Sequence, residues 1–297
     1  MLNLWKASGR WALAGLVAGI GAIAYAQGYA RPGTINYVEG NATLDGQPIA
    51  VKQLGSIELQ PGHVLQTGAG KAEMLLTPGV FLRLGDNSAV KMVSPSLTDT
   101  QVELVRGEAL VEVEQVAKEN KLQVAVGSAA TRMEKRGIYG FRTVQPGVAV
   151  YEGKAVIQVD DHTVDATKGD SVSFDAKKLK TQDFNRKRTD DLYAWSDLRS
   201  QYVAQANAST AQTVVMNHPS WWYGTGWYWN PWFDSWAFVP GAGFYGSPFG
   251  GFGFYSPAFW SYYAPYGGFG RYGGGVAGFR GGMSPGLARG GFGGGHR

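Results

Sequence analysis

The sequence PGHVLQTGAGKAEMLLTPGVFLRLGDNS, at residues 61–88, decides the fold class of this chain. It contains two short runs rich in apolar residues, at 72–76 and 81–84, and residues that favour turns stand on both sides of each run. Short apolar runs separated by Gly, Pro, Asp and Asn are typical of β-strands joined by turns. The stretch therefore predicts neighbouring strands.

The same pattern continues on both sides of this stretch, from about residue 32 to residue 174. Asp45-Gly46 predicts a type I′ hairpin turn, because both central positions of that turn need a positive φ. A regular succession of short strands with almost no helical periodicity predicts an all-β domain with antiparallel hairpins, either a sandwich or a short β-solenoid. The expected strands are residues 34–38, 41–44, 72–76, 81–84, 89–93, 102–105, 109–113, 122–126, 140–144, 148–151, 155–159 and 172–174.

Four glutamates fall within or near adjacent strands of this region: Glu103, Glu108, Glu112 and Glu114. A line of acidic residues is compatible with a cation site or a sugar site. The simpler interpretation is that these side chains face solvent and keep the sheet soluble. We therefore expect them to be exposed.

Five sequence motifs in this region match those of a known family. They are Gly-x-x-Leu-x-Thr-Gly at 62–68, Ala-Glu-Met-Leu-Leu at 72–76, Arg-Leu-Gly-Asp-Asn-Ser at 83–88, Leu-Val-Arg-Gly-Glu-Ala-Leu at 104–110 and Val-Ala-Val-Tyr-Glu-Gly-Lys-Ala-Val at 148–156. Together they resemble the FecR domain family over about residues 33–175. Pro78 and residues 137–141 depart from the family's usual pattern.

The resemblance implies an extracytoplasmic β domain. Signalling members of the family carry a cytoplasmic helical region before one transmembrane helix, and through it they control a sigma factor. Only ten residues precede the apolar run of this chain, so the resemblance favours an extracytoplasmic module for binding or scaffolding. The alternative is a periplasmic signalling subunit resembling FecR-type regulators of sigma factors and transport.

The first 26 residues have the pattern of a secretory signal peptide. Lys6 and Arg10 precede the apolar run 11–23, and Ala24-Tyr25-Ala26 fits the small-x-small cleavage rule, which makes Gln27 the expected new N-terminus. We expect an exported protein of the periplasm or outer envelope. The alternative is an inner-membrane protein anchored by residues 11–26, although this run is short for a membrane-spanning helix.

Beyond the expected β domain, at residues 27–182, the period of apolar residues changes. Leu192, Trp195, Leu198, Tyr202 and Val203 recur at spacings of about three to four, which predicts an amphipathic helix over residues 189–206. Thr189 or Asp190 can cap its first turn. We expect a linker and helix at 183–215, with the helix packed against the end of the β domain.

Residues 216–297 form a tail rich in glycine and aromatic residues, with 23 of the 44 glycines lying beyond residue 220. This composition predicts a disordered, adhesive segment, because glycine adds ordering entropy without burying surface. Aromatic rings can stack on sugars or on other rings. We expect partners among envelope proteins or glycans, self-association through the tail, and no nucleic acid. The candidate interaction residues are Trp221, Trp222, Trp227, Trp229, Trp232, Trp236 and Trp260.

No motif in the chain predicts an enzyme. Without any cysteine, thiol catalysis and cysteine-based zinc sites are excluded. The four histidines are widely spaced, and the Gly-x-Gly-x-x-Gly match at 241–246 lies in a glycine-rich segment rather than between a strand and a helix. We therefore assign no catalytic, cofactor-binding or metal-binding residue.

Overall fold

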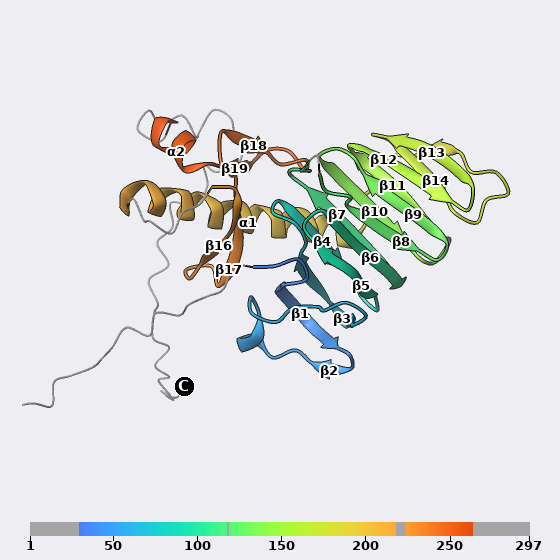
Figure 1. Ribbon diagram of the computed structural model, residues 1–297, viewed down its shortest axis with the longest axis horizontal. Helices are drawn as coiled ribbons and strands as arrows, with labels where there is room; N and C mark the ends of the chain where they lie inside the picture. The colour runs from blue at the N-terminus through green and yellow to red at the C-terminus, as the bar shows by residue number, and fades with distance from the viewer. Residues whose placement is uncertain (1–29, 118, 218–223, 264–297) are drawn as a thin grey trace, which may run out of the picture.

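The computed structural model describes residues 30–117, 119–217 and 224–263 (Figure 1). These residues form mainly β-strands, with one long helix and one short helix. The strands are β1 Ile35–Leu44, β2 Gln47–Pro48, β3 Val64–Leu75, β4 Val80–Leu84, β5 Ala89–Ser96, β6 Asp99–Arg106, β7 Glu108–Val113, β8 Gln123–Val126, β9 Ala129–Met133, β10 Gly137–Arg142, β11 Gly147–Glu152, β12 Lys154–Val159, β13 His162–Thr167, β14 Asp170–Ser173, β15 Thr181–Asp183, β16 Gly226–Asn230, β17 Ser235–Val239, β18 Phe244–Gly246 and β19 Gly253–Tyr255. The helices are α1 Asp191–Asn217, α2 Pro257–Tyr263 and the single 3-10 turn η1 Val51–Gln53.

Strands β1 to β15 belong to one sheet that folds over on itself into a nearly closed sandwich. Its central strands follow the order β6-β5-β3-β4-β7-β10-β11, and their pairs are antiparallel. The one parallel pair among the described strands is β6 with β8. The structure confirms the predicted all-β fold class and favours the sandwich over the solenoid.

The turn predicted at Asp45-Gly46 is present. The φ angles are 49° at Asp45 and 79° at Gly46, and the turn joins β1 to the short strand β2. Both positions have the positive φ that a type I′ turn requires. The sequence predicted two strands at 34–38 and 41–44, whereas the structure has one strand, β1, with a register shift between Gly40 and Ala42.

The central strands are buried on both faces. Successive side chains of a strand point to opposite faces, so Leu82 of β4 enters the main core inside the sandwich, whereas Phe81 and Arg83 point to the other side. We call this second side the outer face. All five residues of β4 are buried, because α1 and the strands β16–β19 cover the outer face.

Helix α1 is longer than predicted and buries a different set of residues. Asp190 caps it as predicted, since its Oδ1 accepts a hydrogen bond of 2.8 Å from the amide of Tyr193. Leu198 and Tyr202, which were expected on the packed face, are 51% and 50% exposed. The buried face is largely polar or small and consists of Leu192, Ser196, Arg199, Ser200, Val203, Ala204, Ala206, Asn207, Thr210, Ala211 and Val214. Apolar periodicity misplaced this face because polar side chains of α1 meet polar partners on the sheet.

The glycine- and aromatic-rich segment at 224–263 is folded, which corrects the expectation of disorder for these residues. It forms the hairpins β16–β17 and β18–β19 and the short helix α2. Phe238 and Phe254 are fully buried with Phe81 of β4 and Val203 of α1. The aromatic rings thus pack into a second hydrophobic core on the outer face of the sheet. Their burial offsets the entropy cost of ordering the glycines.

Several sequence-based expectations fall outside the described residues. They concern the signal peptide at 1–26, the cleavage residues Ala24, Ala26 and Gln27, the tail beyond residue 263, and Trp221 and Trp222. Within the described part of the chain, no helix is long and apolar enough to span a membrane.

Candidate functional site

The outer face of the sheet carries a buried cluster of charged side chains around Arg83. Glu73 of β3 lies directly opposite Arg83 of β4, and Glu112 of β7 lies diagonally across from it. Arg83 Nε donates to Glu73 Oε2 at 2.9 Å, and its Nη1 donates to Glu112 Oε2 at 2.7 Å. All three side chains are fully buried. Such a cluster is tolerated only where charges and hydrogen bonds compensate for lost hydration.

Helix α1 and the C-terminal strands complete this cluster. Arg199 of α1 donates from Nε to the second oxygen of Glu73 at 3.1 Å, and from Nη2 to Ser235 Oγ of β17 at 2.8 Å. Ser200 and Ser247 both donate to Glu112 Oε1, at 2.6 and 3.2 Å. Sheet, helix and C-terminal segment therefore share one hydrogen-bonded network.

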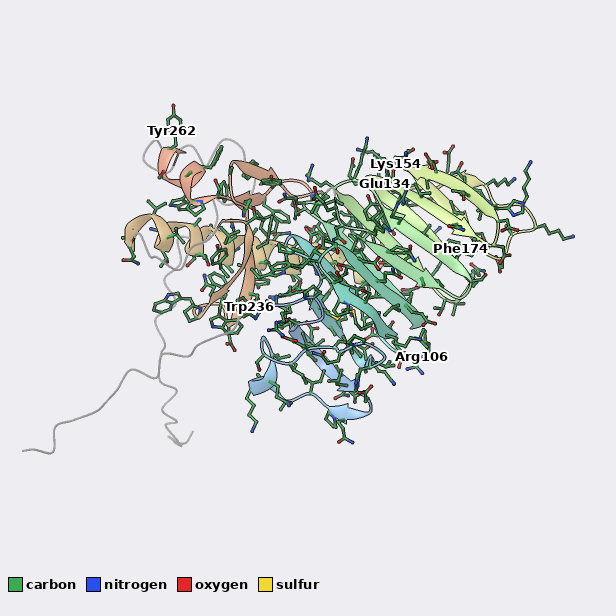
Figure 2. The ribbon with its side chains drawn as sticks, in the orientation of Figure 1. Arg106, Glu134, Lys154, Phe174, Trp236 and Tyr262 are labelled. Atoms are coloured by element: carbon green, nitrogen blue, oxygen red, sulfur yellow. The ribbon has the colours of Figure 1, made fainter. Side chains whose placement is uncertain are left out.

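Asn36 of β1 links the same network to the C-terminal hairpin. Its amide nitrogen donates to Glu73 Oε1 at 2.8 Å, and its side-chain oxygen accepts from the backbone amide of Trp236 at 2.9 Å. The indole nitrogen of Trp236 donates to the carbonyl of Gly55 at 2.7 Å. Trp236 consequently lies where the β domain meets the hairpin, as Figure 2 shows.

The charges in this cluster set the protonation of Glu73. Burial would raise the pKa of its carboxyl group, but the nearby guanidinium groups of Arg199 and Arg83 outweigh burial and hold the pKa below its ordinary value. Glu73 is therefore ionised in the folded protein. The cluster is closed to solvent and its charges are paired, but Nη2 of Arg83 has no hydrogen-bond partner among the described residues.

Glu114, which directly follows β7, is the least compensated member of the buried region. Neither of its carboxyl oxygens has a hydrogen-bond partner among the described residues, and the nearest cation, Arg136 Nε, is 3.8 Å from Oε2. Burial, followed by the neighbouring carboxylate of Glu112, raises the pKa of Glu114 well above its ordinary value. Arg136 also donates to the carbonyl of Gly246 in β18, so this carboxyl group lies beneath the C-terminal segment.

The expectation that the four glutamates face solvent is wrong for Glu112 and Glu114. Both are buried because α1 and β18 cover the outer face at this point. Glu103 is half-buried and pairs with Lys91 of the neighbouring strand, whereas Glu108 is exposed at the rim of a pocket. Strand periodicity alone does not show where a helix packs against a sheet face, so the sequence analysis placed Glu112 and Glu114 at the surface.

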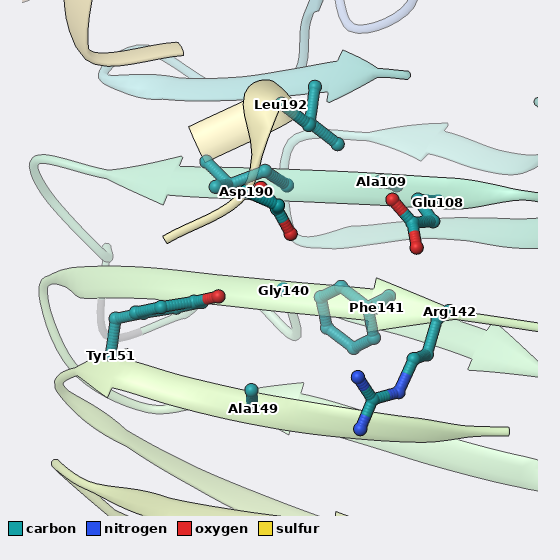
Figure 3. Close-up of a pocket in the computed structure, with 10 residues that line it drawn as sticks. Glu108, Ala109, Gly140, Phe141, Arg142, Ala149, Tyr151, Asp190 and Leu192 are labelled. Atoms are coloured by element: carbon teal, nitrogen blue, oxygen red, sulfur yellow. The ribbon is translucent and has the colours of Figure 1, made fainter. Parts of the chain in front are cut away.

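The pocket lies on the outer face beside the beginning of α1, where the helix leaves the sheet uncovered (Figure 3). It has a volume of about 40 Å³ and opens to solvent. Of the residues that line this pocket, the sequence analysis considered only Glu108 for a binding site, as one of four glutamates compatible with a cation site or a sugar site. Its lining consists of Glu108, Ala109, Leu110, Gly140, Phe141, Arg142, Ala149, Tyr151, Asp190 and Leu192.

The candidate tryptophans divide into three groups. Trp227 and Trp236 are 5% exposed and pack inside the outer-face core, so their rings are used within this chain. Trp229 and Trp260 are half-buried. Trp232, in the turn between β16 and β17, is 86% exposed. Only Trp232, among the described candidates, presents its ring fully to solvent.

The described residues contain no group of three or more His, Asp and Glu side chains placed to hold a metal ion. The acidic and basic side chains with the most unusual surroundings, Glu73, Arg83, Glu112 and Glu114, are sealed inside the protein. This arrangement can stabilise the fold and fix the C-terminal segment in place. Among the described residues, the pocket and the exposed apolar side chains offer open surface for binding.

The comparison with known families confirms the resemblance found in the sequence. Residues 63–156, which run from the start of β3 into β12, match the family described as FecR protein. Residues 63–156 of this chain are thus similar to a FecR domain. No curated protein matches the chain.

Two crystal structures resemble part of the chain, both of a proposed anti-sigma factor from Parabacteroides distasonis, at 2.50 and 1.65 Å resolution. Each is 14% identical in sequence, has a TM-score of 0.38, and covers 44% of this chain. The similarity spans 63% of the other protein's length.

Replacing Arg83 with methionine tests whether the buried cluster holds the fold together. The R83M variant leaves Glu112 and part of Glu73 without their charged partner, and such a loss in a buried pair costs about 3–5 kcal/mol. We expect the free energy of unfolding in urea to fall by this amount. The matched control is K91A, because Lys91 forms a partly exposed pair with Glu103 and its loss costs about 0–1 kcal/mol. Equal losses in the two variants would contradict the account.

Replacing Glu114 with glutamine tests its protonation. The folded-state pKa lies above the ordinary value of 4.5, so the folded protein holds the proton more tightly than the unfolded chain does. The stabilisation of the folded protein by this bound proton is fully present below about pH 4.5. It is lost as pH rises through the folded-state pKa, and the free energy of unfolding then falls by up to about 1.4 kcal/mol per pH unit. The E114Q variant cannot lose this proton.

We therefore expect E114Q to gain stability relative to the natural protein as pH rises. Urea unfolding of both proteins between about pH 4 and pH 8 measures this difference, and groups that titrate alike in both proteins cancel. A difference that stays constant over this range would show that Glu114 does not carry the proposed proton.

Proposed function

We propose that this protein is a non-enzymatic regulator of the FecR type, which acts outside the cytoplasmic membrane through contact with another protein. The observation that carries the proposal is the FecR match over residues 63–156, the central strands of the folded sheet. The burial of the charged cluster supports it, since these groups are engaged in holding the fold together and do not face a substrate.

The exposed face of α1 supplies a surface for such a contact. Leu198 and Tyr202 lie four residues apart, and this spacing places them on one side of the helix. Both are about half exposed, at 51% and 50%, on a helix whose opposite side is fixed to the sheet by Arg199 and Ser200. A rigid helix that presents an aromatic and an aliphatic side chain is a common way of binding a protein groove.

A second candidate function is binding to the envelope through the hairpin β16–β17. Trp232 at its turn is 86% exposed, and an exposed indole ring can stack on a sugar or bind a membrane interface. In this function the protein would be a scaffold or adhesion module. The export signal expected at residues 1–26 supports either function.

Site-specific photocrosslinking in the native cell tests the regulator. We expect a photoreactive residue in place of Tyr202 to give a crosslink to an outer-membrane transporter or to an inner-membrane regulator of a sigma factor. The control replaces Val144, which is 78% exposed in the turn between β10 and β11, and it should give no such product. A third probe in place of Trp232 tests the second candidate.

Each outcome of this experiment decides between the two functions. A protein partner captured at Tyr202 and absent at Val144 supports the regulator. Crosslinks only to lipid or glycan at Trp232, with none at Tyr202, would reject the regulator and favour the envelope-binding module. Because each of the three probes replaces an exposed side chain, loss of folding is not expected to obscure the result.

A further inference from the structure

The pocket beside α1 has a floor of small residues. Gly140 of β10 pairs with Ala149 of β11, and the two positions leave a hollow between larger neighbours on the outer face. A Cβ atom at Gly140 would lie 3.1 Å from the Tyr151 ring, so the glycine lets this ring lie close against β10. Leu192, in the first turn of α1, forms the opposite wall (Figure 3).

Opposite charges stand on the two strands that border this hollow. Glu108 of β7 and Arg142 of β10 are direct partners in the strand register. The structure nevertheless shows no ion pair between them, and the guanidinium group of Arg142 points toward the side of Ala149 (Figure 3). A carboxylate and a guanidinium group are thus held at the rim of one hollow without forming a direct ion pair.

A second carboxylate stands on the same side as Glu108. Asp190 uses Oδ1 to cap α1, at 2.8 Å from the Tyr193 amide, and it lines the pocket. Burial, and then the charge of Asp190, raise the pKa of Glu108, while Arg142 opposes this effect. The two carboxylates repel each other, so a cation placed between them would be stabilised.

Tyr151 adds a fixed polar group. Its ring contacts Phe184 and Tyr193, with ring centroids 5.0 and 4.8 Å away, and its hydroxyl group points toward the hollow. Burial raises the pKa of Tyr151 to about 12, so the hydroxyl group keeps its proton at neutral pH and can donate a hydrogen bond.

We propose that this pocket binds a free α-amino acid. Arg142 and the Tyr151 hydroxyl group receive its carboxylate, and Glu108 with Asp190 receive its ammonium group. Two acidic side chains against one basic side chain give the pocket a formal charge of −1, so an amino acid with a second amino group binds more tightly than a neutral one.

The size of the pocket agrees with this class of ligand. A cavity needs about 10–15 Å³ to hold one water molecule, so the pocket's volume of about 40 Å³ has room for roughly three waters. This volume is enough for much of the amino and carboxyl end of an amino acid. Because the pocket is open, the side chain of the ligand would extend into solvent. Recognition therefore depends on the charged groups shared by all amino acids.

Isothermal titration of the purified, full-length protein with lysine at neutral pH tests the proposal, together with amide chemical-shift mapping. We expect saturable binding and shifts at Gly140 and Ala149, weaker binding of alanine, and no binding of lysine blocked at its α-amino and carboxyl groups. The R142A and E108Q variants should each weaken lysine binding by about tenfold or more, equivalent to about 1.4 kcal/mol. The control R132A, on strand β9 away from the pocket lining, should bind lysine normally.

Three outcomes would overturn the proposal. The first is the absence of saturable binding by the natural protein, which does not depend on any variant. The second is equal binding of lysine and of its blocked derivative, since the charged groups would then play no part. The third is equal weakening in R142A and R132A, which would point to general charge effects. None of these results bears on the crosslinks of the proposed regulator, so the two proposals can fail separately.

Discussion

The placement of Arg83 on the outer face of the sheet constrains the rest of this structure. A guanidinium group in the middle of a sheet cannot be left in an apolar environment without partners, because the loss of hydration costs several kcal/mol. Glu73 and Glu112 on the two neighbouring strands supply opposite charges at hydrogen-bonding distance. Their remaining oxygens then need donors, and α1 and the C-terminal segment provide them through Arg199, Ser200 and Ser247.

This requirement explains why an aromatic, glycine-rich segment folds. Next to the charged cluster, Leu75 and Phe81 form an apolar surface that would otherwise face water. The hairpin β16–β17 and the strand β19 cover this surface with aromatic rings, and Asn207 of α1 hydrogen-bonds to both the Phe238 carbonyl and the Tyr255 backbone. Polar contacts thus fix the position of the segment, and aromatic packing supplies buried area.

The sequence predicted the inner half of the structure well. Turn residues and alternating apolar positions identified most strands of the sheet, the Asp45-Gly46 turn and the FecR resemblance, because these features depend on neighbours in sequence. The strands β9, β13 and β15 were not predicted. The outer half was predicted poorly. Glu112, Glu114, Arg199 and Ser200 are polar, and periodicity assigns polar residues to the surface unless a partner distant in sequence is known.

The candidate site was equally difficult to predict. Glu108, Arg142 and Asp190 are far apart in sequence and share a pocket only because β7, β10 and the beginning of α1 meet there. One signal was available in principle. Gly140 and Ala149 interrupt strands of larger residues, and small residues within strands often mark a close approach of other groups. These small residues point to a pocket only once the strand register shows that Gly140 and Ala149 are neighbours.

The central claim is that α1 and the segment 224–263 are integral to the folded domain that contains residues 63–156. Hydrogen exchange of the full-length protein, followed residue by residue, tests it most directly. The account predicts that the amides of β17 in the C-terminal hairpin are protected to a degree similar to those of β4 and β7, because one buried network joins them. Rapid exchange in β17 alongside strong protection in β4 and β7 would contradict the claim, since the C-terminal segment would then open independently of the sheet.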